Sequence, residues 1–106
     1  MLFNFFNYSD AIVALVNECT DNCIHIVVSA SNDHKNACLQ TPAAAPSAIM
    51  VGTSDRLDKM AGLLNYGPCV DIYAPGIQIL LAFIRNDTDS WFLDRTSMSI
   101  PHVAAQ

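Results

Sequence analysis

Positive charge is scarce in this chain of 106 residues. Five Lys and Arg residues stand against ten Asp and Glu residues, which gives a formal net charge of −5, and the acids are scattered along the sequence without forming a run. Proteins that bind nucleic acid neutralise phosphates with clustered Lys and Arg side chains, and this sequence holds no such cluster. The composition therefore argues against nucleic acid as a partner.

Long apolar stretches are also missing. The longest rich run, residues 77–84, has the length of a strand and falls well short of the roughly 20 residues that span a bilayer. Residues 1–6 carry no basic side chain ahead of their apolar patch, so they make a poor secretion signal. We therefore expect no membrane partner, and we expect the signal of a secreted full-length protein to lie outside this chain.

The cysteines lack the C-x-x-C spacing of zinc and redox sites. Four are present, at positions 19, 23, 38 and 69. Cys19 and Cys23 stand four apart near an expected helix end, where they are either neighbours or buried thiols, and the spacing does not decide between the two.

What remains is a weakly charged, apolar chain, with 52% hydrophobic and 14% charged residues. This composition suits part of a buried sheet better than a free-standing small protein. Apolar residues on one face predict a helix from Ser9, which can cap it, through residue 16. Strands are expected at 24–30, 48–53 and 70–73, and a hairpin at 77–84 and 89–93. Residues 33–40 predict a polar surface loop, and 41–46 an irregular Ala/Pro-rich segment. The pattern predicts one α/β domain with a largely parallel sheet.

Ser97 is the expected nucleophile. Apolar residues 91–93 predict a strand end, and residues 98–105 predict a buried helix whose first turn can hold Pro101. A serine at such a junction lies where unpaired backbone N–H groups and the positive end of the helix dipole converge. An oxyanion beside it would be stabilised, which is typical of acyl transfer.

The segment around Ser97 resembles the nucleophile motif of the subtilisin-like serine proteases, Gly-Thr-Ser-Met-Ala followed by a small residue and Pro-His-Val-Ala. Thr-Ser-Met at 96–98 and Pro-His-Val-Ala at 101–104 match with the right spacing. The likeness runs from about Tyr8 to the last residue and is closest to the proteinase K and aqualysin branch, through the segments at 46–48, 51–55, 65–67 and 69–76. It implies a subtilisin-like, largely parallel sheet flanked by helices, incomplete in this chain. It also implies a serine endopeptidase that acts on peptides or proteins through an acyl-enzyme and needs no cofactor for the chemistry.

The resemblance assigns roles to individual residues. Ser97 is the nucleophile, and Asn32, at the end of a β-branched run, resembles the oxyanion-hole asparagine that acts with the Ser97 N–H. Taken alone, Asn32 is better explained as a residue that turns the chain after a strand; beside Ser97 the oxyanion role is favoured. One wall of the substrate pocket is expected from the segment Ser29, Ala30 and Ser31.

Two stabilising features are implied in the same way. A structural calcium ion would be held by Pro46, Ala48 and Asp71, since oxygen ligands suit this cation; the alternative is an Asp71 that caps or pairs locally. Cys38 and Cys69 resemble a disulfide of the aqualysin branch, which would imply an oxidising, extracellular location; the alternative is two buried thiols.

The base and its orienting acid are not found. The family's Asp-Thr/Ser-Gly and His-Gly-Thr-His motifs are absent, and none of the three histidines, His25, His34 and His102, has that context. We therefore expect residues 1–106 to be the carboxyl-side part of a catalytic domain, inactive without the missing amino-side part.

Three positions depart from the family pattern. Arg95 and Ser31 stand where glycines precede the nucleophile and Asn32, and residues 4–7 replace a Gly-rich substrate strand. The changes at Arg95 and Ser31 favour the alternative function, a non-catalytic binding or inhibitory module. An unrelated small α/β structural protein would require the motif matches to be coincidence. Asn7 and Asn86 match the glycosylation pattern, and only Asn86 is expected to be accessible.

Overall fold

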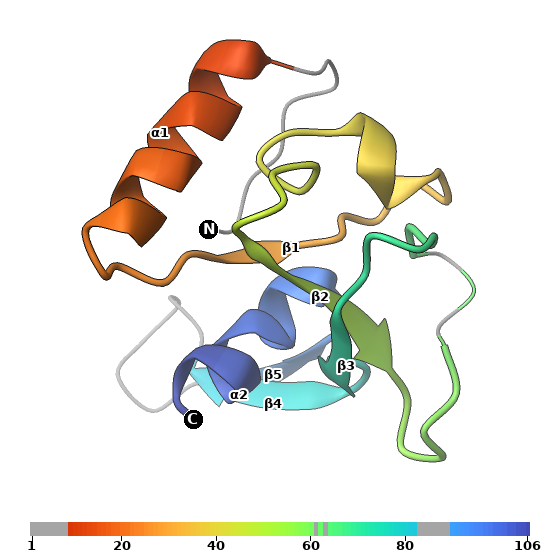
Figure 1. Cartoon of the computed structure of the whole chain (residues 1–106). Coiled ribbons are helices and arrows are strands. Elements are labelled where there is room, and N and C mark those ends of the chain that lie inside the picture. Colours follow the sequence, from red (N-terminus) through yellow and green to blue (C-terminus); the bar gives the residue numbers. More distant parts are fainter. Residues whose placement is uncertain (1–8, 61, 63, 83–89) are drawn as a thin grey trace.

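The computed structural model describes residues 9–60, 62, 64–82 and 90–106 (Figure 1). The elements are α1 (Asp10–Asp21), β1 (Val27–Ser29), the 3₁₀ turn η1 (Ala37–Leu39), β2 (Ile49–Ser54), β3 (Ile72–Pro75), β4 (Ile79–Ala82), β5 (Ser90–Leu93), the 3₁₀ turn η2 (Thr96–Met98) and α2 (Ile100–Ala104). Strands β1, β2 and β3 form a parallel sheet in that order, and β4 and β5 form an antiparallel pair. The predicted α/β class with a parallel sheet is confirmed.

The sheet is covered on both faces. Val28 pairs with Met50 and points to the side of α1, where these two residues pack with Val16. Since successive side chains of a strand point to opposite faces, Ser29 and Thr53 point the other way. There they contact the segment of η2 and α2. Figure 1 accordingly shows α1 and α2 on opposite sides of β1 and β2. Burial on both faces explains why the first two strands read as apolar runs.

Helix α1 begins without the side-chain cap that the sequence suggested, whereas its end is capped. Ser9 has the extended backbone of an N-cap, but its side chain makes no capping hydrogen bond, so this detail of the prediction was wrong. At the other end, the N–H of Ile24 donates to the carbonyl of Cys19 at 2.9 Å and that of Cys23 to Thr20 at 3.0 Å. Cys23 has φ 62, which makes it the left-handed residue of a Schellman motif, a position usually held by glycine.

The segment 33–40 is less exposed than its polar composition indicated. Ala37 is fully buried and Gln40 is 4% exposed. The N–H of Ala37 donates to the carbonyl of Tyr66 at 2.8 Å, and the adjacent Cys38 is covalently tied to Cys69. Contacts distant in sequence therefore pull this loop into the core.

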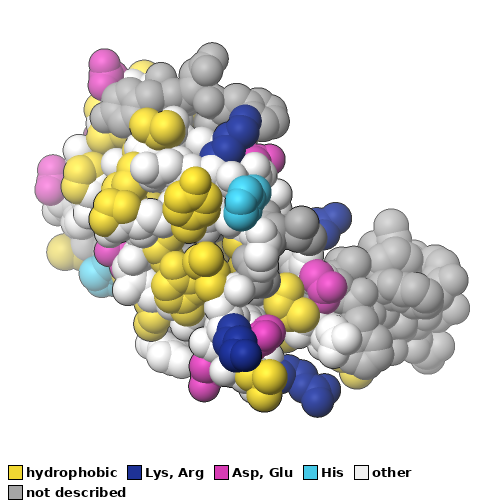
Figure 2. Space-filling view, turned by 90° about the vertical axis from the view of Figure 1, so that its right-hand side faces the viewer, with side chains coloured by type: hydrophobic (Ala, Val, Ile, Leu, Met, Phe, Trp, Pro, Cys, Tyr) yellow, Lys and Arg dark blue, Asp and Glu magenta, His cyan; other side chains and the backbone are white. Residues whose placement is uncertain are grey.

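Strand β3 forms one edge of the described sheet and leaves apolar side chains in solvent. Ile72, Tyr73 and Met60 are between 43% and 51% exposed, and the Tyr73 hydroxyl donates to the Met60 sulfur at 3.7 Å. Figure 2, which views the molecule from the β3 side, shows hydrophobic side chains gathered in the middle of this face.

Some predictions lie outside the described residues. These are the turn of the hairpin with Asn86, and residues 4–7 with Asn7. The two strands of that hairpin are confirmed as β4 and β5. In the part of the chain that the structure describes, no helix has the length and apolarity to cross a membrane.

Candidate active site

Ser97 lies in the turn η2, between β5 and α2. Arg95 precedes the turn with an extended backbone; the N–H of Met98 donates to Arg95 and that of Ser99 to Thr96, both at 3.0 Å. Helix α2 begins at Ile100, with Pro101 in its first turn. The sequence predicted a helix over 98–105, directly after Ser97; the helix begins only at Ile100, and Ser97 lies in a separate 3₁₀ turn before it. Pro101 fits the first turn of α2, because backbone N–H groups there have no partner within the helix and proline has no N–H.

Asn32 follows the carboxyl end of β1 and reaches the same turn. Its side-chain oxygen accepts the N–H of Thr96 at 3.0 Å and the Thr96 hydroxyl at 3.2 Å. The contact joins segments 64 positions apart and places Asn32 beside the residue that precedes Ser97. The two residues predicted to act together are therefore neighbours in the fold.

The orientation of the Asn32 carboxamide follows from its partners. A backbone N–H can only donate, so the atom that faces Thr96 must be the carboxamide oxygen. The nitrogen Nδ2 points elsewhere, and it donates to no group among the described residues; the same holds for the N–H of Ser97. Two donors at one turn are thus left to bind a ligand oxygen.

A directed chain of hydrogen bonds supports this arrangement. The single proton of the buried Thr96 hydroxyl is used on Asn32, so in the 2.5 Å contact between Ser29 and Thr96 the Ser29 hydroxyl must donate. The Ser29 oxygen in turn accepts the N–H of Ser31 at 2.9 Å. Such chains polarise one another and rigidify the groups they join. From the sequence, Ser29 was expected only in the pocket wall, and its part in this chain of hydrogen bonds was not predicted.

Ser99 and Gly76 also hold the turn, through contacts with β2 and the end of β3. The Ser99 hydroxyl lies 2.7 Å from that of Thr53 and donates to the carbonyl of Ala74 at 2.9 Å. A Cβ at Gly76 would collide with the Ser99 hydroxyl and would lie 2.8 Å from the carbonyl oxygen of Arg95. Only glycine allows the end of β3 to approach the turn this closely. The Ala-Pro-Gly sequence at 74–76 was the one signal for this contact.

The predicted pocket wall has a mixed character. Ser29 and Ala30 are buried, with side chains directed into the fold, so only their backbone can line a cleft. Ser31 is partly exposed and has φ 77, in the left-handed region. Its hydroxyl donates to a carboxylate oxygen of Asp33 at 3.0 Å. Serine here accepts the backbone conformation for which the family pattern has glycine.

Arg95 stands where the family pattern has glycine, yet it does not crowd Ser97. Its backbone is extended, with φ −153 and ψ 148, a conformation open to any residue. The exposed side chain donates through Nη1 to the carbonyl of Asp94 at 2.8 Å. The missing glycine therefore causes no backbone strain at this position.

The histidines stay apart from Ser97. His34 packs edge-on against the ring of Tyr66, with the centroids 5.7 Å apart, and His25 and His102 are exposed. Within the described residues, no histidine is hydrogen-bonded to Ser97. No base for Ser97 is thus found among them.

The three residues predicted to hold calcium line one cavity of about 180 Å³. Oδ2 of Asp71 accepts the N–H of Met50 at 2.8 Å, which fixes the carboxylate and leaves Oδ1 for another partner. Among the described residues no group of three or more His, Cys, Asp or Glu side chains gathers for a metal. One carboxylate with nearby backbone carbonyls of Pro46 and Ala48 fits a hard cation that takes oxygen ligands and water.

The predicted disulfide between Cys38 and Cys69 is present, with the Cα atoms 5.5 Å apart. It joins η1 to the segment that leads into β3. Cys19 and Cys23 are unpaired, the first half-buried and the second exposed. The alternative of two buried thiols was therefore wrong.

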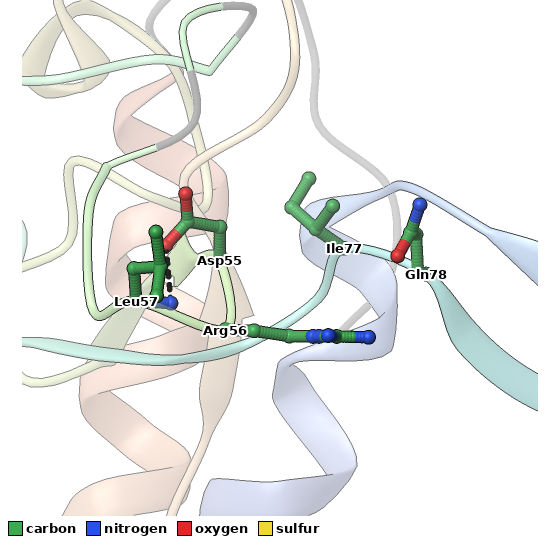
Figure 3. Close-up of a pocket in the computed structure, with 5 residues that line it drawn as sticks. All are labelled: Asp55, Arg56, Leu57, Ile77 and Gln78. Atoms are coloured by element: carbon green, nitrogen blue, oxygen red, sulfur yellow. Dashed lines mark hydrogen bonds between the residues drawn. The ribbon is translucent and has the colours of Figure 1, made fainter.

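A second cavity, of about 380 Å³, lies where the chain leaves β2 and β3 (Figure 3). Asp55, Arg56, Leu57, Ile77 and Gln78 line it. Asp55 accepts hydrogen bonds from the N–H groups of Lys59 and Leu57, and these bonds lower the pKa of its carboxyl below the ordinary value of 3.8. Figure 3 shows the Arg56 side chain extending below Ile77 toward Gln78. Neither Ser97 nor Asn32 belongs to this cavity, so it is separate from the candidate active site.

Comparison with known proteins agrees with the geometry. The model of the subtilase family matches residues 6–106. A subtilisin-like serine protease of Rhodotorula mucilaginosa is 43% identical over 96 residues, which are 91% of this chain and 28% of the relative. One of Penicillium rubens is 45% identical over 89 residues, 84% of this chain and 18% of the relative. Cerevisin of Saccharomyces cerevisiae is 43% identical over 96 residues, 91% of this chain and 15% of the relative.

The fold has a close counterpart among solved structures. The crystal structure of a cold adapted subtilisin-like serine proteinase superposes with a TM-score of 0.87 and 32% identity, covering 96% of this chain and 36% of that protein. The parallel sheet flanked by helices is therefore the subtilisin-like arrangement. The chain spans between 15% and 36% of the length of these relatives.

Proposed function

We propose, since this chain belongs to the subtilase family, that residues 1–106 are the carboxyl-side part of the catalytic domain of a serine endopeptidase. The relatives it matches are named serine proteases, and it spans a minor part of each. The observation that carries the proposal is the contact between Asn32 and Thr96, which brings a carboxamide donor to the serine turn.

Ser97 acts as the nucleophile in this proposal. Its hydroxyl oxygen attacks the carbonyl carbon of a peptide bond and gives its proton to a base. The negative charge that forms on the substrate oxygen is stabilised by the Nδ2 group of Asn32 and the N–H of Ser97. The base gives this proton to the amine as the C–N bond breaks, which leaves an acyl-enzyme that water then hydrolyses. Fixed donors suit this step, because they need no reorganisation when the charge develops.

The base and the acid that orients it come from the part of the domain that this chain does not include. The described residues offer Ser97 no histidine, which supports this division. Residues 1–106 by themselves are therefore expected to hydrolyse no peptide. The partners of the complete protein are peptide or protein substrates, and the chemistry needs no cofactor.

A calcium ion at Pro46, Ala48 and Asp71 is the second part of the proposal. When bound, the ion supplies charge neutralisation and cross-links the segment before β2 to the one before β3. It takes no part in the chemistry at Ser97. In the intact protein, Asp71→Ala is expected to abolish the rise in melting temperature that millimolar CaCl₂ produces over EDTA, whereas Asp58→Ala, at an exposed loop site, keeps it. An equal rise in both variants would remove Asp71 from the site.

We place the protein in an extracellular, oxidising compartment. The Cys38–Cys69 bridge supports this location, since disulfides persist outside the reducing cytosol.

A non-catalytic binding or inhibitory module is the alternative. It rested on Arg95 and Ser31. Arg95 adopts an unstrained backbone and turns its side chain toward Asp94, so it gives this alternative no support. Ser31 has a left-handed backbone although it is not glycine. This is the one observation that still favours the binding or inhibitory module.

Peptidase activity of the intact protein separates the two functions. We expect turnover of peptide substrates that falls by at least 10³-fold in Ser97→Ala, while Ser47→Ala, a serine in another part of the fold, retains it. Activity that survives Ser97→Ala would exclude Ser97 as the nucleophile. An inactive wild-type protein that still folds would favour the binding module.

A further inference from the structure

Asn65 is a fully buried carboxamide, with 0% exposure. Its oxygen Oδ1 accepts the N–H of Asp33 at 2.9 Å and that of Lys35 at 2.8 Å. Its own backbone N–H donates to the carbonyl of Ser31 at 3.1 Å. Three of its hydrogen bonds therefore hold the short segment 31–35, which includes Asn32.

The remaining group of Asn65 closes a ring. Nδ2 donates to Oε1 of Gln40 at 3.0 Å, and Nε2 of Gln40 donates to Oδ2 of Asp33 at 3.2 Å. Because Oδ1 of Asn65 already accepts two backbone N–H groups, its nitrogen must face Gln40, and Gln40 must then present its nitrogen to Asp33. The hydrogen-bond partners thus fix which end of each carboxamide, that of Asn65 and that of Gln40, faces its neighbour. A buried network of this kind rigidifies the groups it joins.

The gripped segment needs such support. Ser31 has φ 77 and His34 has φ 52, and non-glycine residues in the left-handed region persist only where the surroundings hold them. Asn32, between them, is exposed and is anchored at its side chain by Thr96 alone among the described residues. The direction of its Nδ2 group therefore depends on the backbone that Asn65 holds.

We propose that Asn65 is a positioning residue that holds segment 31–35 so that Asn32 presents its Nδ2 group to the oxyanion. This inference rests on the proposed function of Asn32 and Ser97. Loss of the clamp lets Asn32 shift while Ser97 stays in place. The expected effect is on transition-state stabilisation, hence on kcat, and much less on substrate binding.

The test compares Asn65→Ala with a matched carboxamide variant in the intact protein. Asn36→Ala is the control, since the Asn36 side-chain oxygen also accepts a backbone N–H, but that of Cys38 at 2.9 Å and not one of segment 31–35. Active sites are counted by titration with a fluorophosphonate, so that loss of folded protein is separated from loss of rate. Asn65→Ala is expected to lower kcat per titrated site by about 10- to 100-fold, with KM changed less than about threefold, as a shift of a catalytic donor by about 1 Å does. Asn36→Ala is expected to keep kcat per site.

Amide hydrogen exchange provides a readout that needs no activity. The N–H groups of Asp33 and Lys35 are expected to exchange slowly in the wild type and at least 10-fold faster in Asn65→Ala. Unchanged kcat per titrated site in Asn65→Ala would overturn the positioning role, even if the exchange rates rise. A wild-type protein that neither reacts with the fluorophosphonate nor cleaves peptides would instead overturn the proposed function, and the positioning role with it, whatever the exchange rates.

Discussion

The side-chain oxygen of Asn32 accepts both the backbone N–H and the hydroxyl of Thr96, at 3.0 and 3.2 Å. This double contact fixes which end of the carboxamide faces the serine turn. Thr96 is therefore the residue that couples the end of β1 to the turn that holds Ser97. Its hydroxyl is fully buried and is shared with Ser29.

Thr96→Val tests this coupling. The substitution keeps the shape and the backbone N–H but removes the hydroxyl, so Ser29 loses an acceptor and Asn32 a donor. We expect kcat of the intact protein to fall about 10-fold and the free energy of unfolding to fall by about 1–3 kcal/mol, because a buried polar group is left without its partner. Kinetics with titrated active sites and denaturant unfolding measure the two effects.

Thr20→Val serves as the control. It removes a hydroxyl that donates to the carbonyl of Val16 within α1, far along the chain from the site. Its kcat should equal that of the wild type. A Thr96→Val protein with wild-type kcat would show that the contact with Asn32 does not matter for catalysis.

Ser31→Gly is expected to stabilise the fold. Glycine adopts φ 77 without strain, which relieves about 1 kcal/mol, while the exposed hydrogen bond to Asp33 contributes roughly 0.5 kcal/mol that is lost. The net gain should be about 0.5 kcal/mol in the free energy of unfolding. Ser31→Ala loses the same hydrogen bond but keeps the strained backbone, so it should be less stable than the wild type. Equal stabilities of the Gly and Ala variants would refute the strain at this position.

Removal of the Cys38–Cys69 disulfide should cost stability. A bridge that closes a loop with a sequence separation of 31 contributes roughly 3–4 kcal/mol in the chain-entropy model. Cys38→Ser should lose most of that amount in denaturant unfolding, and reductant should have no further effect on the variant. Cys23→Ser, at an exposed unpaired thiol, should match the wild type. Insensitivity of the wild type to reductant would mean that the bridge does not form in solution.

The lowered pKa of Asp55 predicts a pH dependence of stability. In the folded state the carboxylate accepts hydrogen bonds from the N–H of Lys59, which has the larger effect, and from the N–H of Leu57. Its folded pKa therefore lies below the ordinary value of 3.8. The carboxylate therefore stabilises the folded protein above that pH, and the contribution disappears as the pH falls through the lower, folded value. Unfolding curves of the wild type and Asp55→Asn should differ at neutral pH and converge in acid. A difference that stays constant into acid would contradict the lowered pKa.

The sequence could predict those features that depend on local pattern or on a motif. The strands, the helix α1 and the position of Ser97 near α2 follow from apolar spacing and from the proline in the first turn. The pairing of Cys38 with Cys69 and the nearness of Asn32 to Ser97 came from resemblance, because no local pattern joins residues so distant in sequence.

Polar residues with distant partners could not be placed in advance. Asn65 and Gln40 stand in polar or irregular stretches and look solvent-exposed, yet each is buried because the other satisfies it. The same applies to Ser29, whose hydroxyl is matched by Thr96. Such pairs have no signature in composition, since burial of each side chain depends on a partner that the fold supplies. Ser9 shows the opposite error, a favourable local cap that the structure does not use.

The most direct measurement is the site of covalent labelling when the intact protein reacts with a fluorophosphonate, which forms an adduct only with an activated serine. We expect a single adduct, mapped by mass spectrometry to Ser97, and none when the protein is heat-denatured before the reagent is added. Labelling should be slowed by about 10²–10³-fold in Asn32→Leu, a range taken from removal of an oxyanion donor in subtilisin. An adduct on another serine, or labelling of Ser97 at the same rate in Asn32→Leu, would contradict the assignment of these two residues as nucleophile and oxyanion donor.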